Sequence, residues 1–211
     1  MTCLFDGPFF DYILGQPPLS SAKYFTHGSS TMLFTDEDRL YRLTRQGCGH
    51  SFVARESASG NRNVVRVIQD FGPVAPSDEE SNEFYWLAQV ERLVDLDPDD
   101  AITQRLRTIL TELTGDESQL YEEELDLFAR RCTDFANGHF EFRNLLTTLS
   151  TMATFALAHQ ATADIKLDNI MVRPGSNEIV LADPICDQYF EIDDARRDVM
   201  EEIRLRVTGA S

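Results

Sequence analysis

The sequence predicts an α+β protein with two lobes, and three observations lead to this prediction. Short β-prone runs dominate the first part of the 211-residue chain, whereas from Asp97 onward apolar residues recur at the spacing of helices. The length is that of one domain or one two-lobed unit. An apolar content of 42% with 14 Phe indicates a folded chain rather than a disordered acidic polymer. We therefore expect a small antiparallel-sheet lobe at residues 1–90 and a minimal helical lobe at residues 91–211.

The first lobe is predicted to contain five strands and one helix. Residues 1–22 are expected to be irregular because prolines and glycine interrupt them. The strand predictions rest on β-branched and aromatic runs separated by turn residues, at residues 22–25, 31–35, 39–43, 64–71 and 84–90. The helix is predicted at residues 50–59, after the break Gly47-Cys48-Gly49.

The second lobe is predicted to be helical with one inserted hairpin. Asp97-Pro98 is a plausible helix start, since proline suits the first helical position. Apolar spacing then predicts helices over residues 97–113, 119–135, 142–159 and 193–207. Two β-prone runs, 169–172 and 178–182, flank the turn Pro174-Gly175-Ser176-Asn177 and predict a hairpin.

The charge of the chain restricts its partners. The formal charge is −17, and residues 91–126 hold twelve acids and three bases, a local charge of −9. Such a balance argues against direct nucleic-acid binding and against adsorption to anionic lipid, both of which need Lys and Arg. Basic proteins, metal ions and chelated nucleotides remain as partners. We interpret residues 91–126 as a docking surface for a basic protein, whether substrate or target.

The cysteines and the apolar runs predict a cytoplasmic location without a membrane anchor. Cys3, Cys48, Cys132 and Cys186 form no CxxC pair and have no His-x-x-His companion, so free thiols are expected. The first residues carry no basic leader segment, and no apolar run reaches the roughly 18 residues that a membrane span needs.

The residues with the most chemistry lie between positions 163 and 184. Asp164, Lys166 and Asn169 follow an apolar helix, and Asp183 ends the predicted hairpin. Because a hairpin brings its ends together, we expect Asp183 to return close to Asn169. Asp and Asn oxygens are hard ligands suited to Mg²⁺, and a lysine beside them supplies a charge for a phosphoryl oxygen. Asp and Asn also favour turns, so simple turn chemistry is the alternative interpretation.

This stretch resembles the catalytic loop of protein kinases. Asp164, Lys166 and Asn169 match the Asp-x-Lys-x-x-Asn core, and Asp183 lies where the metal-binding Asp of the Asp-Phe-Gly motif is expected. Asp-Pro in place of Asp-Phe-Gly, and the missing His-Arg before Asp164, are similar to serine/threonine kinases encoded by some bacteriophages. The resemblance covers residues 22–190 and is specific over residues 164–184.

The resemblance implies a role for each of these residues, with ATP and Mg²⁺ as cofactors. Asp164 is expected to orient and deprotonate the acceptor hydroxyl, and Lys166 to stabilise the transferring γ-phosphoryl. Asn169 and Asp183 are expected to hold Mg²⁺. The implied activity is phosphorylation of host proteins on Ser or Thr in the host cytoplasm.

The resemblance also implies a nucleotide site in the first lobe. Arg42, in the third strand, takes the place of the ATP-anchoring lysine, and Glu56 in the short helix is its expected ion-pair partner. Gly28 lies in the segment that corresponds to the phosphate-binding loop. Backbone groups of Ala88-Gln89-Val90 are expected to meet adenine.

Three departures from the family pattern support an alternative function. Arginine at position 42 differs from lysine in bulk and geometry. The first inter-strand segment has one glycine, Gly28, instead of three, and the 28 residues after Asp183 predict a minimal lower lobe. The alternative is therefore a catalytically weak or inactive kinase-like protein, which acts as an acidic binder or inhibitor of a basic host protein.

Overall fold

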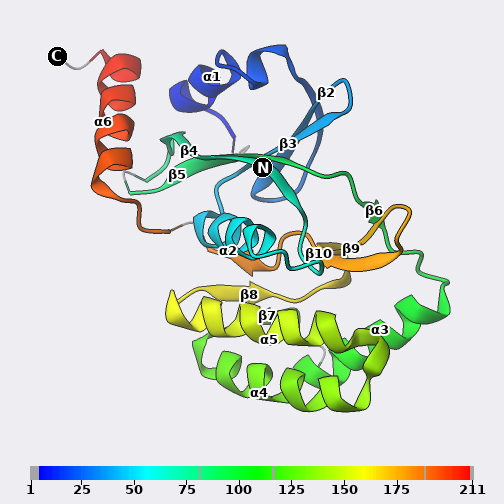
Figure 1. Cartoon of the computed structure of the whole chain (residues 1–211). Helices are drawn as coiled ribbons and strands as arrows, with labels where there is room; N and C mark the ends of the chain where they lie inside the picture. The colour runs from blue at the N-terminus through cyan, green and yellow to red at the C-terminus, as the bar shows by residue number, and fades with distance from the viewer. Residues whose placement is uncertain (1–4, 81, 116, 188, 210–211) are drawn as a thin grey trace. The chain divides into compact units, whose positions relative to one another are not determined.

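The computed structural model describes residues 5–80, 82–115, 117–187 and 189–209 (Figure 1). The chain forms two compact units. The first comprises residues 1–50, 67–91 and 187–211, and the second comprises residues 51–66 and 92–186. The predicted boundary at 90/91 thus lies next to the passage between units at 91/92. Two segments belong to a different unit from the one that we expected. Residues 51–66 lie in the second unit, and residues 187–211 lie in the first.

The first unit contains a five-stranded antiparallel sheet, which confirms the predicted antiparallel sheet. Its strand order is β1-β2-β3-β5-β4. The strands are β1 (Lys23–His27), β2 (Thr31–Asp36), β3 (Arg39–Thr44), β4 (Val67–Pro76) and β5 (Phe84–Val90). Turn residues separate the strands as the sequence predicts, since Gly28 follows β1 and the acidic turn after Asp36 joins β2 to β3.

Strand β4 corrects the predicted strand 64–71. It begins at Val67 and continues to Pro76, through a stretch that the prolines had placed in a loop. Because β4 is the edge strand of the sheet and its register shifts three times, Pro73 and Pro76 fit without breaking a central ladder. One shift lies between Asp70 and Gly72, where Gly72 adopts a positive φ of 70°.

The first helix, α1 (Pro8–Leu14), corrects the prediction that the amino-terminal segment is irregular. Its orphan amides are satisfied from far along the chain, since the carboxylate of Asp78 accepts from the amides of Phe9 at 2.8 Å and Phe10 at 2.9 Å. Gly7, just before the helix, has a φ of 125°, and a Cβ there would come within 2.6 Å of the Asp78 side chain. Pro8 suits the first helical position, whereas the cap of the helix is supplied by tertiary structure.

Helices α1 and α6 (Asp194–Thr208) pack with the sheet of the first unit (Figure 1). Helix α6 lies where the sequence predicts a helix at 193–207, and Asp193 caps it by accepting from the amide of Arg196 at 2.8 Å. The core that these elements enclose is rich in aromatic side chains and comprises Phe5, Phe9, Ile13, Leu19, Phe34, Tyr41, Leu43, Ala75, Phe84, Tyr85, Trp86, Leu87, Ile192, Met200 and Ile203.

The second unit contains the three central helices, α3 (Ala101–Thr114), α4 (Glu122–Gly138) and α5 (Arg143–Ala158) (Figure 1). Their existence and type were predicted correctly, but two starts were wrong. Helix α3 begins with Asp100 as N-cap, three residues after the predicted cap at Asp97. Helix α4 begins at Glu122, because Gln119–Leu120 form a short strand, β7.

Short strands in the second unit form two small sheets. The predicted hairpin is present as β9 (Ile170–Arg173) and β10 (Glu178–Leu181), and β6 (Val94–Asp95) pairs with β9. The second sheet has the order β11-β8-β7, with β8 (Thr162–Asp164) between β7 and β11 (Ile185–Cys186). These two sheets bring residues 162–186 together into one compact region.

Helix α2 (Gly47–Ala58) is longer than the predicted helix at 50–59, because the glycines of Gly47-Cys48-Gly49 lie in its first turn rather than before it. Cys48, Cys132 and Cys186 are free thiols, as predicted, and Cys3 lies outside the described residues. Among the described residues, no helix is both long enough and apolar enough to cross a membrane.

Candidate functional site

The candidate catalytic loop joins β8 to β9 in the second unit. Strand β8 ends at Asp164, whose amide donates to the carbonyl oxygen of Pro184 at 2.9 Å. A single 3₁₀ turn, Leu167–Asn169, follows and leads directly into β9. The loop is therefore held at both ends by sheet pairing, so its polar side chains start from well-defined backbone positions.

Asp164 and Lys166 form an ion pair. The Nζ atom of Lys166 lies 2.7 Å from Oδ2 of Asp164, and the two side chains are 44% and 12% exposed. The hydrogen bond to Asp164 raises the pKa of Lys166, although partial burial of the ammonium opposes the rise. Lysine has three N–H donors and this contact uses one, so the ammonium retains donors for a further oxygen ligand.

The other oxygen of the Asp164 carboxylate, Oδ1, is buried and has no hydrogen-bond partner among the described residues. A buried carboxylate oxygen without a partner is costly and rare in folded proteins, which makes it a candidate for a catalytic or ligand-binding role. The carboxylate is thus anchored by Lys166 on one side and keeps an acceptor available on the other.

Asn169 is oriented by the loop and lies beside the residue that precedes Asp183. Its Nδ2 atom donates to the carbonyl oxygen of Asp164 at 3.0 Å, which leaves Oδ1 as the free end of the amide group. The amide of Ala182 donates to the carbonyl oxygen of Asn169 at 2.8 Å, and Leu181 pairs with Ile170. The hairpin therefore returns Asp183 to the loop, where the sequence analysis expects it.

This region contains oxygen donors of the hard kind that Mg²⁺ accepts. Among the described residues, no group of three or more His, Cys, Asp or Glu side chains is arranged to hold a metal by itself. Asn169, Asp183 and Asp164 instead supply a small number of hard oxygen atoms. Such a set suits an ion whose other ligands are water and phosphate oxygens. Asp183 is half-buried and has further interactions within the structure.

The predicted nucleotide-site residues Gly28, Arg42 and Ala88-Gln89-Val90 belong to the first unit, whereas Glu56 belongs to the second. Gly28 lies between β1 and β2, and its amide donates to the carbonyl oxygen of Thr31 at 2.8 Å. A Cβ built at Gly28 meets no atom within 4 Å. The turn is therefore open at this position, and space alone does not require glycine there.

Arg42 is buried in β3, with 5% of its surface exposed. It pairs with Leu33 on one side and Ala88 on the other. Its positive charge contributes to lowering the pKa of His50, although burial of His50 is the main cause. Arg42 thus lies in a polar cluster of the first unit that the sequence did not predict.

Glu56 has local partners within the second unit. Its Oε1 accepts from Arg55 at 3.2 Å, and its Oε2 accepts from Nδ2 of Asn61 at 3.0 Å. Asn61 is in turn bonded to Thr148 on α5 at 3.2 Å. Glu56 therefore ties α2 to the segment that follows it and, through Asn61, to α5.

The backbone of Ala88-Gln89-Val90 takes part in the sheet. Strand β5 lies between β3 and β4, and all three residues have partners in both neighbouring strands. Their N–H and C=O groups therefore face other strands, since an interior strand uses both of its edges. The first residues beyond the ladder are Glu91 to Leu93, which have no regular secondary structure.

The comparisons with known proteins give no family assignment. No protein-family model matches the chain, and no curated protein matches it.

Proposed function

We propose that the protein is an ATP- and Mg²⁺-dependent serine/threonine protein kinase of the bacteriophage type, which phosphorylates host proteins. The observation that carries the proposal is the Asp164 carboxylate. One oxygen is held 2.7 Å from the Lys166 ammonium, while the other is buried with no partner among the described residues. This is the arrangement that a general base for an acceptor hydroxyl requires, because the carboxylate is fixed and still has an acceptor to offer.

In the proposed reaction, the acceptor hydroxyl donates its hydrogen bond to Oδ1 of Asp164. The hydroxyl oxygen forms a bond to the γ-phosphorus as the bond from that phosphorus to the β–γ bridging oxygen breaks. Asp164 takes the proton, and ADP carries away the bridging oxygen. Most of the rate enhancement would come from positioning and charge stabilisation, as in phosphoryl transfer generally.

Lys166 and the oxygen ligands have separate roles in this proposal. The remaining N–H donors of Lys166 stabilise charge on the γ-phosphoryl oxygens. Asn169 and Asp183 would hold Mg²⁺, which neutralises phosphate charge when bound. The hydrogen bond from Asn169 to the carbonyl oxygen of Asp164 supports this role, because it fixes which end of the amide is available to a cation.

For the nucleotide, the proposal assigns Arg42 to phosphate binding, with Gly28 in the covering turn. The ladder uses the backbone of Ala88-Gln89-Val90 on both sides, so the proposal moves the adenine contact to the backbone that follows β5, from Glu91 onward.

The test is phosphate transfer from labelled ATP with Mg²⁺, measured with the protein alone and with host lysate. Asp164→Asn and Asp183→Asn should abolish transfer while the protein stays folded. A matched control is Asp134→Asn, which removes an exposed carboxylate on α4 outside residues 91–126 and should leave transfer unchanged. If the unaltered protein shows neither transfer nor stabilisation by ATP with Mg²⁺, the enzymatic proposal is wrong.

A second candidate function is binding or inhibition of a basic host protein without catalysis. The observation in its favour is the acidic first turn of α4, in which Glu122 and Glu123 are exposed and Glu124 is partly buried, within the segment that carries a charge of −9. A buried arginine at position 42 and an open turn with a single glycine also favour it. Salt-sensitive capture of one basic host protein, unaffected by Asp164→Asn, would support this function over the kinase.

A further inference from the structure

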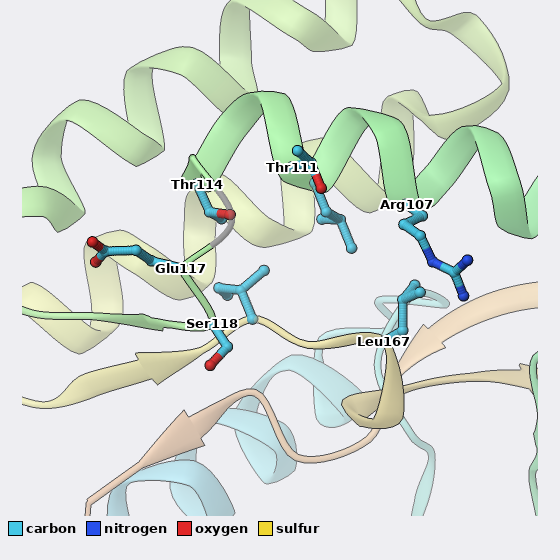
Figure 2. Close-up of a pocket in the computed structure, with 8 residues that line it drawn as sticks. Arg107, Thr111, Thr114, Glu117, Ser118 and Leu167 are labelled. Atoms are coloured by element: carbon cyan, nitrogen blue, oxygen red, sulfur yellow. The ribbon is translucent and has the colours of Figure 1, made fainter.

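A cavity of about 350 Å³ lies in the second unit between the segment after β6, helix α3 and the candidate catalytic loop. The residues that matter for its chemistry are Asp95, Leu96, Thr103, Arg107, Leu167 and Asp168. A smaller cavity of about 130 Å³ adjoins it, because Arg107 and Leu167 line both. Figure 2 shows this smaller cavity, with Arg107, Thr111 and Thr114 projecting from α3 and Leu167 on the opposite side.

Aliphatic and acidic side chains together line the larger cavity. Leu96 and Leu167 supply apolar surface, whereas Asp95 and Asp168 are exposed acids. Arginine and lysine side chains have the complementary character, since an apolar stem carries a cationic head that stays in contact with polar groups. The chain's charge of −17 favours the approach of such a side chain over that of an acid.

Thr103 supplies a second, independent sign that a polar ligand belongs here. It is only 2% exposed, and its Oγ1 atom has no hydrogen-bond partner among the described residues. Two χ1 rotamers are open to a helical threonine, so the hydroxyl can turn toward a ligand without a change in the backbone. A buried hydroxyl without a partner raises the free energy of the folded protein, and a ligand N–H that donates to it removes this cost.

Arg107 is the cation in the wall. Its guanidinium donates to Oε1 of Gln104 on the same helix at 3.4 Å. Its charge opposes a second cation, whereas Asp95 and Asp168 attract one. This opposition makes the inference sharply testable, because changes at Arg107 and at Asp168 should shift affinity in opposite directions.

We propose that this cavity binds an arginine or lysine side chain of a partner polypeptide. Its head lies against Asp95 and Asp168, and it donates a hydrogen bond to Oγ1 of Thr103. Asp168 is part of the same loop as Asp164 and Lys166, so a side chain held here brings neighbouring residues of the same polypeptide to the proposed catalytic carboxylate. The inference rests on the proposed function only for that last step, because binding itself requires no nucleotide.

The experiment is a nucleotide-free titration with two nine-residue peptides. Each has a central serine, and arginine alternates with alanine on both sides in one, while citrulline replaces every arginine in its twin. The full-length protein should bind the arginine peptide at least about tenfold more tightly than the citrulline peptide, because citrulline keeps the shape and loses the charge.

Four variants locate the binding. Asp95→Asn and Asp168→Asn should each weaken binding of the arginine peptide about fivefold, and Arg107→Gln should tighten it. Thr103→Val should weaken it and still fold, since it removes a buried hydroxyl that has no partner among the described residues. The matched control is Asp134→Asn, which makes the same charge change at an exposed position of α4 outside residues 91–126 and should leave affinity within about twofold.

Equal binding of the two peptides would overturn the proposal, and so would equal weakening by Asp134→Asn and Asp168→Asn, which would indicate a diffuse charge effect. The outcome is distinguishable from failure of the kinase proposal. Specific peptide binding without phosphate transfer from ATP would leave this inference intact and remove the enzyme, whereas transfer without arginine preference would do the reverse.

Discussion

The Nε2 atom of His50 lies 2.9 Å from Oδ1 of Asp70, and the same carboxylate oxygen accepts from the amide of Gly72 at 2.8 Å. His50 is 3% exposed, and its ring centroid is 5.1 Å from that of Trp86. Burial lowers the pKa of His50, although the hydrogen bond to Asp70 opposes this. Burial opposes the shift at Asp70, whose pKa is nevertheless lowered by the hydrogen bond and charge of His50. Near neutral pH these directions favour a neutral imidazole beside an ionised carboxylate, with the Nε2–H of His50 as the donor between them.

This pair predicts a loss of stability in mild acid. The folded-state pKa of His50 lies below its ordinary value of 6.5, so the unfolded chain binds more protons just below that pH. The contribution is fully present above pH 6.5 and is lost as the pH falls toward the folded-state pKa. Each pKa unit by which folding lowers the pKa of His50 corresponds to about 1.4 kcal/mol in the free energy of unfolding. The free energy of unfolding, measured with urea, should therefore decrease as the pH is lowered from 8 to 5.

His50→Gln provides the comparison, because glutamine still donates to Asp70 and does not titrate. The variant should show a smaller fall in the free energy of unfolding over the same pH range. An identical pH dependence in the two proteins would mean that His50 is not the titrating group.

Asp78 is predicted to be a major determinant of stability in the first unit. It accepts from the amides of Phe9 and Phe10 and from the hydroxyl of Tyr85 at 2.9 Å. Asp78→Ala leaves these donors without their acceptor and should lower the free energy of unfolding by about 2–3 kcal/mol. Tyr85→Phe removes one of these bonds and should cost less, about 1 kcal/mol. Denaturant titrations measure both, and an Asp78→Ala effect no larger than that of Tyr85→Phe would contradict the assignment.

Asp78 also illustrates why part of the fold could not be predicted from sequence. The strands β1, β2, β3 and β5 and the helices α3 to α6 have strong local patterns, and these predicted their existence and type. Helix α1 is capped by a carboxylate about 70 positions away, so local sequence does not reveal its cap. Strands of two residues, such as β6 and β11, likewise form only because a neighbouring strand pairs with them.

The candidate site likewise contains residues that could be predicted from the sequence and residues that could not. Asp164, Lys166, Asn169 and Asp183 could be selected because a short loop and a hairpin bring them together, and both are local structures. The partners of His50 lie in β4 and β5, and Thr103 lies against a loop more than sixty positions further on. Such clusters arise from tertiary packing, so no spacing in the sequence indicates them.

Two adjacent arginines on α4 give a matched prediction about helix ends. Arg131 donates to the carbonyl oxygens of Leu113 at 3.1 Å and of Glu112, in the last turn of α3. These are carbonyls that a helix end leaves without internal partners, and a cation there also suits the helix dipole. Arg131→Ala should therefore lower the free energy of unfolding by about 1–2 kcal/mol.

Arg130 is the control for this prediction. It pairs with Asp126 on the same helix at 2.5 Å, with side chains 69% and 64% exposed. Such a surface pair contributes little, so Arg130→Ala should change the free energy of unfolding by no more than about 0.5 kcal/mol. If thermal or urea unfolding finds the two variants equally destabilised, Arg131 does not act through the end of α3.

Lys166 is predicted to matter for activity far more than for folding. The chain has only two lysines, and the other one, Lys23, lies on the exposed edge strand β1. Replacing Lys23 is therefore a control that makes the same substitution away from the candidate catalytic loop. Lys166→Ala should reduce phosphate transfer from ATP by at least about 100-fold, since it removes a donor aimed at developing charge and the anchor of Asp164. Because the Lys166 side chain is 44% exposed, the free energy of unfolding should change by less than about 1 kcal/mol. Lys23→Ala should leave both quantities unchanged, and a Lys166→Ala protein that retains full transfer activity would exclude Lys166 from the proposed catalytic role.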